Sequence, residues 1–238
     1  AGANGSLVLP AAGEPCEDAN RTLDAVDAML ALEAPLRGCR AFMESRAVGI
    51  TNLTVAVDTA LLAYTHVLVY TVSSLVEQTT PVAHLIFDAV ASVSEISFVD
   101  KDLDPEEVGG TVLWEAPPEA ERVEAYLVYF SPGVEALGRL RVSGSGVGTS
   151  EAPIPAETPL EVHRHLLVYT RSSLVEQTTP VVAALNDTAS SVANVTFPDF
   201  DLDVGDLGGT LQWVAPEDAG QVTHYVVYFA TRNTTAMG

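Results

Sequence analysis

The sequence predicts a mainly β protein, with tandem β-sandwich units behind a short helical N-terminal segment. A long stretch of the chain repeats at a domain-sized distance, and the repeated part contains short runs rich in Val, Tyr and Trp that end at Pro or Gly. Helical periodicity is weak after residue 48. Because 47% of the 238 residues are apolar, the chain can form a substantial core.

The N-terminal part, residues 1–47, lies outside the repeat. Residues 18–42 place Leu23, Val26 and Met29 among acidic residues, which predicts one or two short helices interrupted at Pro35 and Gly38. The two cysteines are Cys16 and Cys39. In an oxidising compartment we expect them to form a disulfide, closing a loop that contributes about 3 kcal/mol.

The repeat has a period of 99 residues, since residues 66–81 return almost unchanged as residues 165–180. At this offset residues 48–139 align with residues 147–238 without a gap, and roughly forty of about ninety pairs are identical. Such a period matches a sandwich domain and exceeds a solenoid repeat. We expect a complete domain over residues 92–190, later strands of a first unit over 48–91, and first strands of a further unit over 191–238.

The repeated unit contains several predicted strands. Residues 110–117 and 209–216 alternate apolar and polar positions and end at proline, while residues 123–130 and 222–229 are rich in Tyr and Val. Residues 165–170 form another such run. Alternation predicts that the Trp and Tyr side chains of these strands belong to the core rather than to a sugar-binding platform.

The order of these strands carries a resemblance to a known family. An acidic segment precedes a Trp strand ending in Ala-Pro, a Tyr-x-Val-Tyr strand, a Gly/Ser loop and a Leu-Val-Tyr strand. This order resembles fibronectin type III and related immunoglobulin-like domains, as found in tandem in secreted surface proteins. Trp114 and Trp213 match the strand B tryptophan of that family, and Tyr126 and Tyr225 match its strand C tyrosine. The sequence departs from the family at the tyrosine corner, where residues 158–165 read Thr-Pro-Leu-Glu-Val-His-Arg-His.

Every asparagine of the chain is followed two residues later by Ser or Thr, with no intervening proline. The chance expectation for all of them together is roughly one in 10⁵, so the pattern predicts N-linked glycans and a secreted or extracellular surface location. The predicted glycosylation sites are Asn4, Asn20, Asn52, Asn186, Asn194 and Asn233.

The charge balance excludes one class of partner. Eleven basic residues against 32 acidic residues give a net charge of −21, which repels nucleic acid. No apolar run approaches the roughly 18 residues that a membrane-spanning helix needs, so no membrane span is expected in this chain.

An acidic motif is the best candidate for a metal site. Carboxylates at alternating positions of an extended segment point the same way, and a bend at the following Gly-Gly pair could gather them around calcium. The alternative is a solvated acidic turn, and the spacing is not that of an EF-hand. The motif comprises Asp100, Asp102 and Asp104 with Glu106 and Glu107, and it is repeated as Asp199, Asp201 and Asp203 with Asp206.

No catalytic residue is predicted, and calcium is the only cofactor considered. The chain lacks a Gly-x-Ser-x-Gly motif, and His163 and His165 are expected to be strand histidines rather than metal ligands.

We therefore expect a structural or adhesive repeat glycoprotein outside the cell, not an enzyme. Its expected partners are copies of itself, joined head-to-tail into a filament or surface layer, or other surface proteins. The half-domains leave two alternatives open, because either the chain is a window on a longer repeat protein or the halves pair between molecules. The rival function is a carbohydrate-binding module of a larger receptor or secreted enzyme, which an exposed aromatic cluster would favour.

Overall fold

The computed structural model describes residues 40–232, and every regular element within them is a β-strand. The mainly β prediction is thereby confirmed. Residues 1–39 and 233–238 lie outside the described residues, and with them most of the predicted helical segment. The chain divides into two compact units, with the boundary between Phe87 and Asp88.

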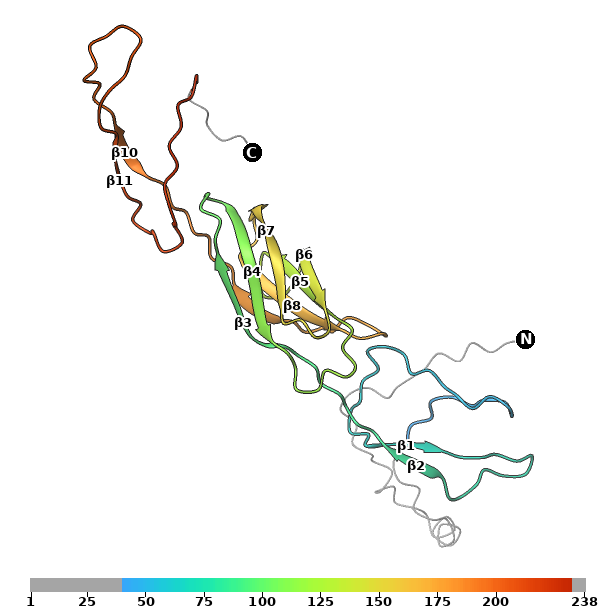
Figure 1. Ribbon diagram of the computed structural model, residues 1–238. Coiled ribbons are helices and arrows are strands. Elements are labelled where there is room, and N and C mark those ends of the chain that lie inside the picture. The colour runs from blue at the N-terminus through green and yellow to red at the C-terminus, as the bar shows by residue number, and fades with distance from the viewer. Residues whose placement is uncertain (1–39, 233–238) are drawn as a thin grey trace. The chain divides into compact units, whose positions relative to one another are not determined.

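One sheet of the second unit has three antiparallel strands. It contains β3 (Ser94–Asp100), β4 (Glu107–Glu115) and β7 (Glu151–Pro159), in the order β3-β4-β7 (Figure 1). Strand β4 alternates as the sequence suggests, because Val112 and Trp114 are buried whereas Thr111 and Leu113 face solvent. This period of two places the apolar residues of β4 on a single face.

The other sheet of this unit has four antiparallel strands in the order β6-β5-β8-β9. They are β5 (Ala125–Ser131), β6 (Leu140–Gly146), β8 (His165–Arg171) and β9 (Val181–Ala184). Strand β5 lies between β6 and β8, and Val128 lies opposite Val168 in the β5–β8 pair. Both central strands are rich in Val, Leu and Tyr, as expected for strands that are covered on both faces.

A single apolar cluster joins side chains from both sheets. Trp114 of β4 lies 5.2 Å from Tyr126 of β5 between ring centroids, and Phe130 is fully buried. Burying a large apolar side chain of this kind contributes about 1.5–3 kcal/mol. The cluster contains Val93, Val108, Val112, Trp114, Val123, Tyr126, Val128, Phe130, Ala152, Ile154, Leu160, Leu166, Val168 and Leu185.

A second, smaller cluster lies on the opposite face of the four-stranded sheet. Leu127, Leu167 and Tyr169 are buried there, and Tyr129 and Ala136 pack against them. The sequence pattern did not predict this cluster, because the cluster exists only where both faces of β5 and β8 are covered. The cover comes from the segment between β5 and β6, which contributes Ala136.

The remaining strands form two separate pairs, β1 (His66–Val69) with β2 (Val82–Leu85) and β10 (Ala193–Thr196) with β11 (Gln212–Val214). We call residues 99 positions apart counterparts. His66 lies opposite Leu85, as its counterpart His165 lies opposite Ala184. The β1–β2 pair therefore has the register of the β8–β9 pair.

Unusual backbone angles also recur at the offset of 99. L-residues rarely adopt positive φ, so their recurrence shows that counterpart segments take the same local path. The φ angles are 57° at Asp58 and 59° at Glu157, 49° at Leu62 and 48° at Glu161, and 50° at both Glu95 and Asn194.

One predicted strand is absent from the described structure. Residues 222–229 belong to no strand, and the predicted strand at 209–216 is reduced to β11. The counterpart of residues 222–229 includes β5, which is hydrogen-bonded to β6 on one side and to β8 on the other. The counterparts of β6 and β8 are residues 41–47 and 66–72, which belong to the first unit. A strand requires a hydrogen-bonded neighbour, so apolar alternation alone did not produce one here.

Candidate functional site

Asp100 lies at the end of β3 and organises the loop that follows it. Its carboxylate is buried and accepts hydrogen bonds from three backbone amides, Asp102 N at 3.0 Å, Gly109 N at 2.9 Å and Thr188 N at 2.8 Å. Amide donors stabilise a buried carboxylate and use both of its oxygens. Asp100 is therefore engaged with the backbone rather than directed at a shared ion site.

Glycine is required next to this loop. A Cβ added at Gly109 would lie 2.7 Å from Ala156 Cα, and one added at Gly110 would lie 2.6 Å from Val99 O. The Gly-Gly pair that ends the acidic motif thus allows β4 to lie close to β3 and β7.

Four carboxylates gather beside Asp100. Asp102 and Asp104 come from the loop, Glu107 begins β4, and Glu157 comes from β7, and one oxygen of each lies within 4.8 Å of the others. Asp102 is buried, and its two oxygens accept Asp104 N at 3.1 Å and Glu157 N at 2.6 Å. Sequence analysis singled out the first three as part of the motif but missed Glu157, which only the β4–β7 pairing brings near.

The pKa of Glu107 is raised above its ordinary value. The main cause is a hydrogen bond with Glu157, followed by burial and by the negative charges of Glu157, Asp102 and Asp104. Carboxylates this close repel one another when all are ionised. The cluster can therefore relieve its charge in two ways, by retaining a proton or by binding a cation.

The second acidic motif repeats the first one at the level of the backbone. Asp199 accepts Asp201 N at 3.0 Å and Gly208 N at 2.9 Å, and Asp201 accepts Asp203 N at 3.1 Å. These bonds match those of Asp100 and Asp102, but here the three aspartates are not buried. The loop conformation is thus encoded locally, whereas its burial depends on the surrounding sheets.

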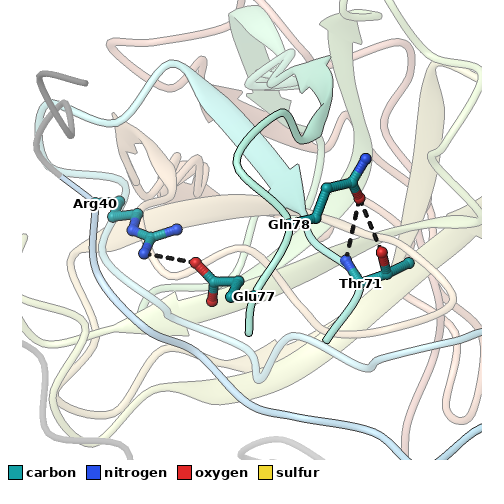
Figure 2. Close-up of polar contacts among 4 residues, drawn as sticks. All are labelled: Arg40, Thr71, Glu77 and Gln78. Atoms are coloured by element: carbon teal, nitrogen blue, oxygen red, sulfur yellow. Dashed lines mark hydrogen bonds and ion pairs between the residues drawn. The ribbon is translucent and has the colours of Figure 1, made fainter. Parts of the chain in front are cut away.

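A polar network also recurs on the two units. Figure 2 shows Arg40 directed at Glu77, with 2.8 Å between Nη2 and Oε1, and Gln78 Oε1 accepting from Thr71. Their counterparts form the same pairs, because Arg139 bonds Glu176 at 2.6 Å and Thr170 bonds Gln177 at 3.1 Å. The correspondence therefore includes Arg40, which precedes the repeated sequence at residues 48–139.

The predicted glycosylation sites divide between described and undescribed residues. Asn52, Asn186 and Asn194 are all exposed to solvent, so an oligosaccharide could be attached without disturbing a core. Asn4, Asn20 and Asn233 lie outside the described residues, as do Cys16 and Cys39.

Two segments of the chain, residues 40–87 (the 40–87 segment) and residues 191–232 (the 191–232 segment), expose residues whose counterparts are buried. Phe229 is 92% exposed although its counterpart Phe130 is 0% exposed, and Val69 is 65% exposed although its counterpart Val168 is 0% exposed. Large exposed apolar surfaces of this kind mark sites of interaction.

We call residues 92–190, which contain β3 to β9, the complete unit. The predicted core aromatics are confirmed there, because Trp114 and Tyr126 are buried. Their counterparts Trp213 and Tyr225 keep the same approach, with 5.3 Å between ring centroids, although Tyr225 is exposed. His163, expected to be a strand histidine, is buried just before β8, and its Nδ1 lies 3.1 Å from Leu160 O.

Comparison with protein-family models and with curated proteins finds no match for this chain. Among the described residues, no helix is long and apolar enough to cross a membrane.

Proposed function

We propose that this chain is an extracellular, N-glycosylated structural or adhesive repeat protein. The observation that carries the proposal is that the same strand register, loop conformation and ion pairs recur at an offset of 99 residues in separate parts of the chain. Repetition of a domain-sized unit lengthens a protein without adding a new site, as in tandem-domain surface proteins.

We further propose that the complete unit is a β-sandwich of the fibronectin type III-like class. Two antiparallel sheets with the orders β3-β4-β7 and β6-β5-β8-β9 share one apolar cluster, which supports a face-to-face arrangement. Trp114 on the second strand and Tyr126 on the third strand of this unit agree with the resemblance seen in the sequence.

The extracellular location rests on the asparagines. All six lie in acceptor sequences, and the three described ones are exposed. Intact-mass measurement of the native protein before and after glycosidase treatment tests this. We expect a mass loss corresponding to several glycans, and an unchanged mass would remove the argument for secretion.

Calcium remains a proposal for the acidic cluster. The hard oxygen donors of Asp102, Asp104, Glu107 and Glu157 suit this ion. Asp100, which the sequence placed in the predicted site, holds the loop behind them. In the second motif, Asp201 and Asp203 occupy the places of Asp102 and Asp104, and Asp199 occupies that of Asp100.

The rival function is carbohydrate binding, and the 191–232 segment does expose Tyr228 and Phe229. The counterpart of Phe229 lies in the core cluster of the complete unit, which favours packing over ligand recognition. Titration of the native protein with soluble polysaccharides separates the two functions, since saturable binding abolished by Tyr228→Ala would favour the rival.

A further inference from the structure

The complete unit consists of two halves that are both present a second time in the chain. Residues 92–133 supply β3, β4 and β5, and residues 139–186 supply β6 to β9. The 191–232 segment repeats the first half and the 40–87 segment repeats the second half, each at the offset of 99. The structure therefore holds a template for how these two segments fit together.

We propose that the 191–232 segment of one copy docks on the 40–87 segment of a second copy, with the contacts that join the halves of the complete unit. This inference rests on the proposed structural role and names its partner as another copy of the same chain. Residues 222–229 would then become a strand on the edge of β1 that pairs with no described strand, and this pair would be the counterpart of the β5–β8 pair. Adding a strand to a sheet edge supplies backbone hydrogen bonds as well as side-chain contacts.

The apolar surfaces of the two segments are complementary. In the complete unit Tyr126, Val128 and Phe130 pack in one cluster with Ile154, Leu166 and Val168. The counterparts of these six residues are all apolar and exposed. They are Tyr225, Val227 and Phe229 on the 191–232 segment and Val55, Val67 and Val69 on the 40–87 segment.

Polar groups fix the register of the same contact. In the complete unit Gln177 Nε2 donates to Ser92 Oγ at 2.5 Å, and Thr170 Oγ1 donates to Ala91 O at 2.6 Å. Gln78 is the counterpart of Gln177, and Thr71 is the counterpart of Thr170. Figure 2 shows the Gln78 amide nitrogen pointing away from Thr71. In the docked pair this nitrogen would donate to Ser191 of the other copy, which is the counterpart of Ser92.

The join would also complete a contact between one arginine and two tyrosine rings. Arg139 Cζ lies 4.3 Å from the Tyr169 ring centroid and 4.5 Å from that of Tyr129. Arg40 lies 4.6 Å from the ring of Tyr70, the counterpart of Tyr169. Tyr228, which is 83% exposed, is the counterpart of Tyr129 and would bring a second ring against Arg40.

The acidic cluster would also be reassembled across the join. Three residues of the cluster lie on the first half, and their counterparts in the 191–232 segment are Asp201, Asp203 and Asp206. The fourth residue, Glu157, lies on the second half, and its counterpart is Asp58 of the 40–87 segment. All four positions remain acidic although Asp58 comes from the other segment. The glycosylation sites stay clear of the join, because Asn52 and Asn194 correspond to the exposed residues Glu151 and Glu95.

The contact is head-to-tail, so a joined pair of copies retains one unpaired segment at each end. Contacts between two different surfaces of the same molecule propagate as filaments unless the rotation closes a ring. The geometry thus assigns filament or ring growth to the two exposed segments.

Variants with one added cysteine test the docking and its register. Val128 lies opposite Val168, so Val227→Cys in one copy should lie opposite Val69→Cys in another, within the distance that a disulfide spans. We expect a mixture of the two variants to form a covalent heterodimer under mild oxidation. Val227→Cys mixed with Ala83→Cys is the matched control, since Ala83 lies on β2, away from the expected partner strand.

Several outcomes would overturn the proposal. Equal cross-linking of both mixtures would contradict the register, and a covalent monomer from the double variant Val69→Cys/Val227→Cys would place the contact within one chain. A protein that stays monomeric at high concentration, with no cross-link between the two variants, would overturn the docking. A glycosylated monomer would refute the docking but remain consistent with the extracellular role. An assembled protein without glycans would support the docking and refute the argument for secretion.

Discussion

Arg139 stacks on the ring of Tyr169, with 4.3 Å between Cζ and the ring centroid, and so closes the outer face of the four-stranded sheet. The guanidinium also pairs with Glu176, whose other oxygen accepts a hydrogen bond from Tyr129 at 2.7 Å. Burial, followed by this hydrogen bond, raises the pKa of Tyr129. One arginine thus joins an ion pair, two aromatic contacts and the covering of the second apolar cluster.

Replacing this arginine should destabilise the complete unit. Arg139→Ala removes two cation–π contacts and a partly exposed ion pair, and we expect a loss of about 1–2 kcal/mol in the free energy of unfolding. Arg141→Ala, at an exposed position of β6, is the control and should change it by less than about 0.5 kcal/mol. Denaturant unfolding measures both, and equal losses would show that Arg139 has no special role.

Asp100 should be more important for stability than its counterpart Asp199. Asp100→Ala leaves three backbone amides without their acceptor in a buried loop, so we expect a loss of about 3 kcal/mol. Asp199→Ala changes the exposed counterpart and should cost less, because water can replace the carboxylate. Comparable losses for the two variants, measured by denaturant unfolding, would contradict the assignment of Asp100 as a buried acceptor.

The acidic cluster predicts a specific pH dependence. Because the pKa of Glu107 is raised in the folded state, its contribution to stability is fully present below its ordinary pKa and is lost as the pH rises through the raised value. Glu107→Gln should therefore increase the Tm relative to the unsubstituted protein, and by more as the pH is raised from about 4 to 7. Glu157→Gln removes the main cause of the raised pKa of Glu107 and should also increase the Tm more at pH 7 than at pH 4. A Tm difference that does not change with pH would refute this explanation.

Calcium should stabilise the protein if the cluster binds it. A ligand that binds only the folded state adds RT ln(1 + [L]/Kd), about 2.7 kcal/mol at a hundredfold excess over Kd. We expect the Tm to fall on addition of EDTA, and Glu157→Gln to reduce this response while keeping the fold. An EDTA-independent Tm would leave the acids as a solvated cluster.

The sequence by itself determined the β class, the period of 99 residues and the local conformation of each repeated segment. The Asp199 loop shows this, since Asp199 accepts the counterparts of two of the three backbone amides that Asp100 accepts, although it is exposed. Alternation also identified Trp114 and Tyr126 as core residues, because a strand directs every second side chain to the same face.

Only the tertiary structure decided which of these segments become buried and paired. Phe130 and Phe229 lie in nearly the same local sequence, yet the first is fully buried and the second is 92% exposed. The same holds for Glu157, which joins the acidic cluster through the pairing of β4 with β7 and lies 55 residues from Asp102. Strand pairing and burial depend on contacts between residues distant in the chain, so a local pattern can encode a strand's conformation without supplying the neighbour that completes it.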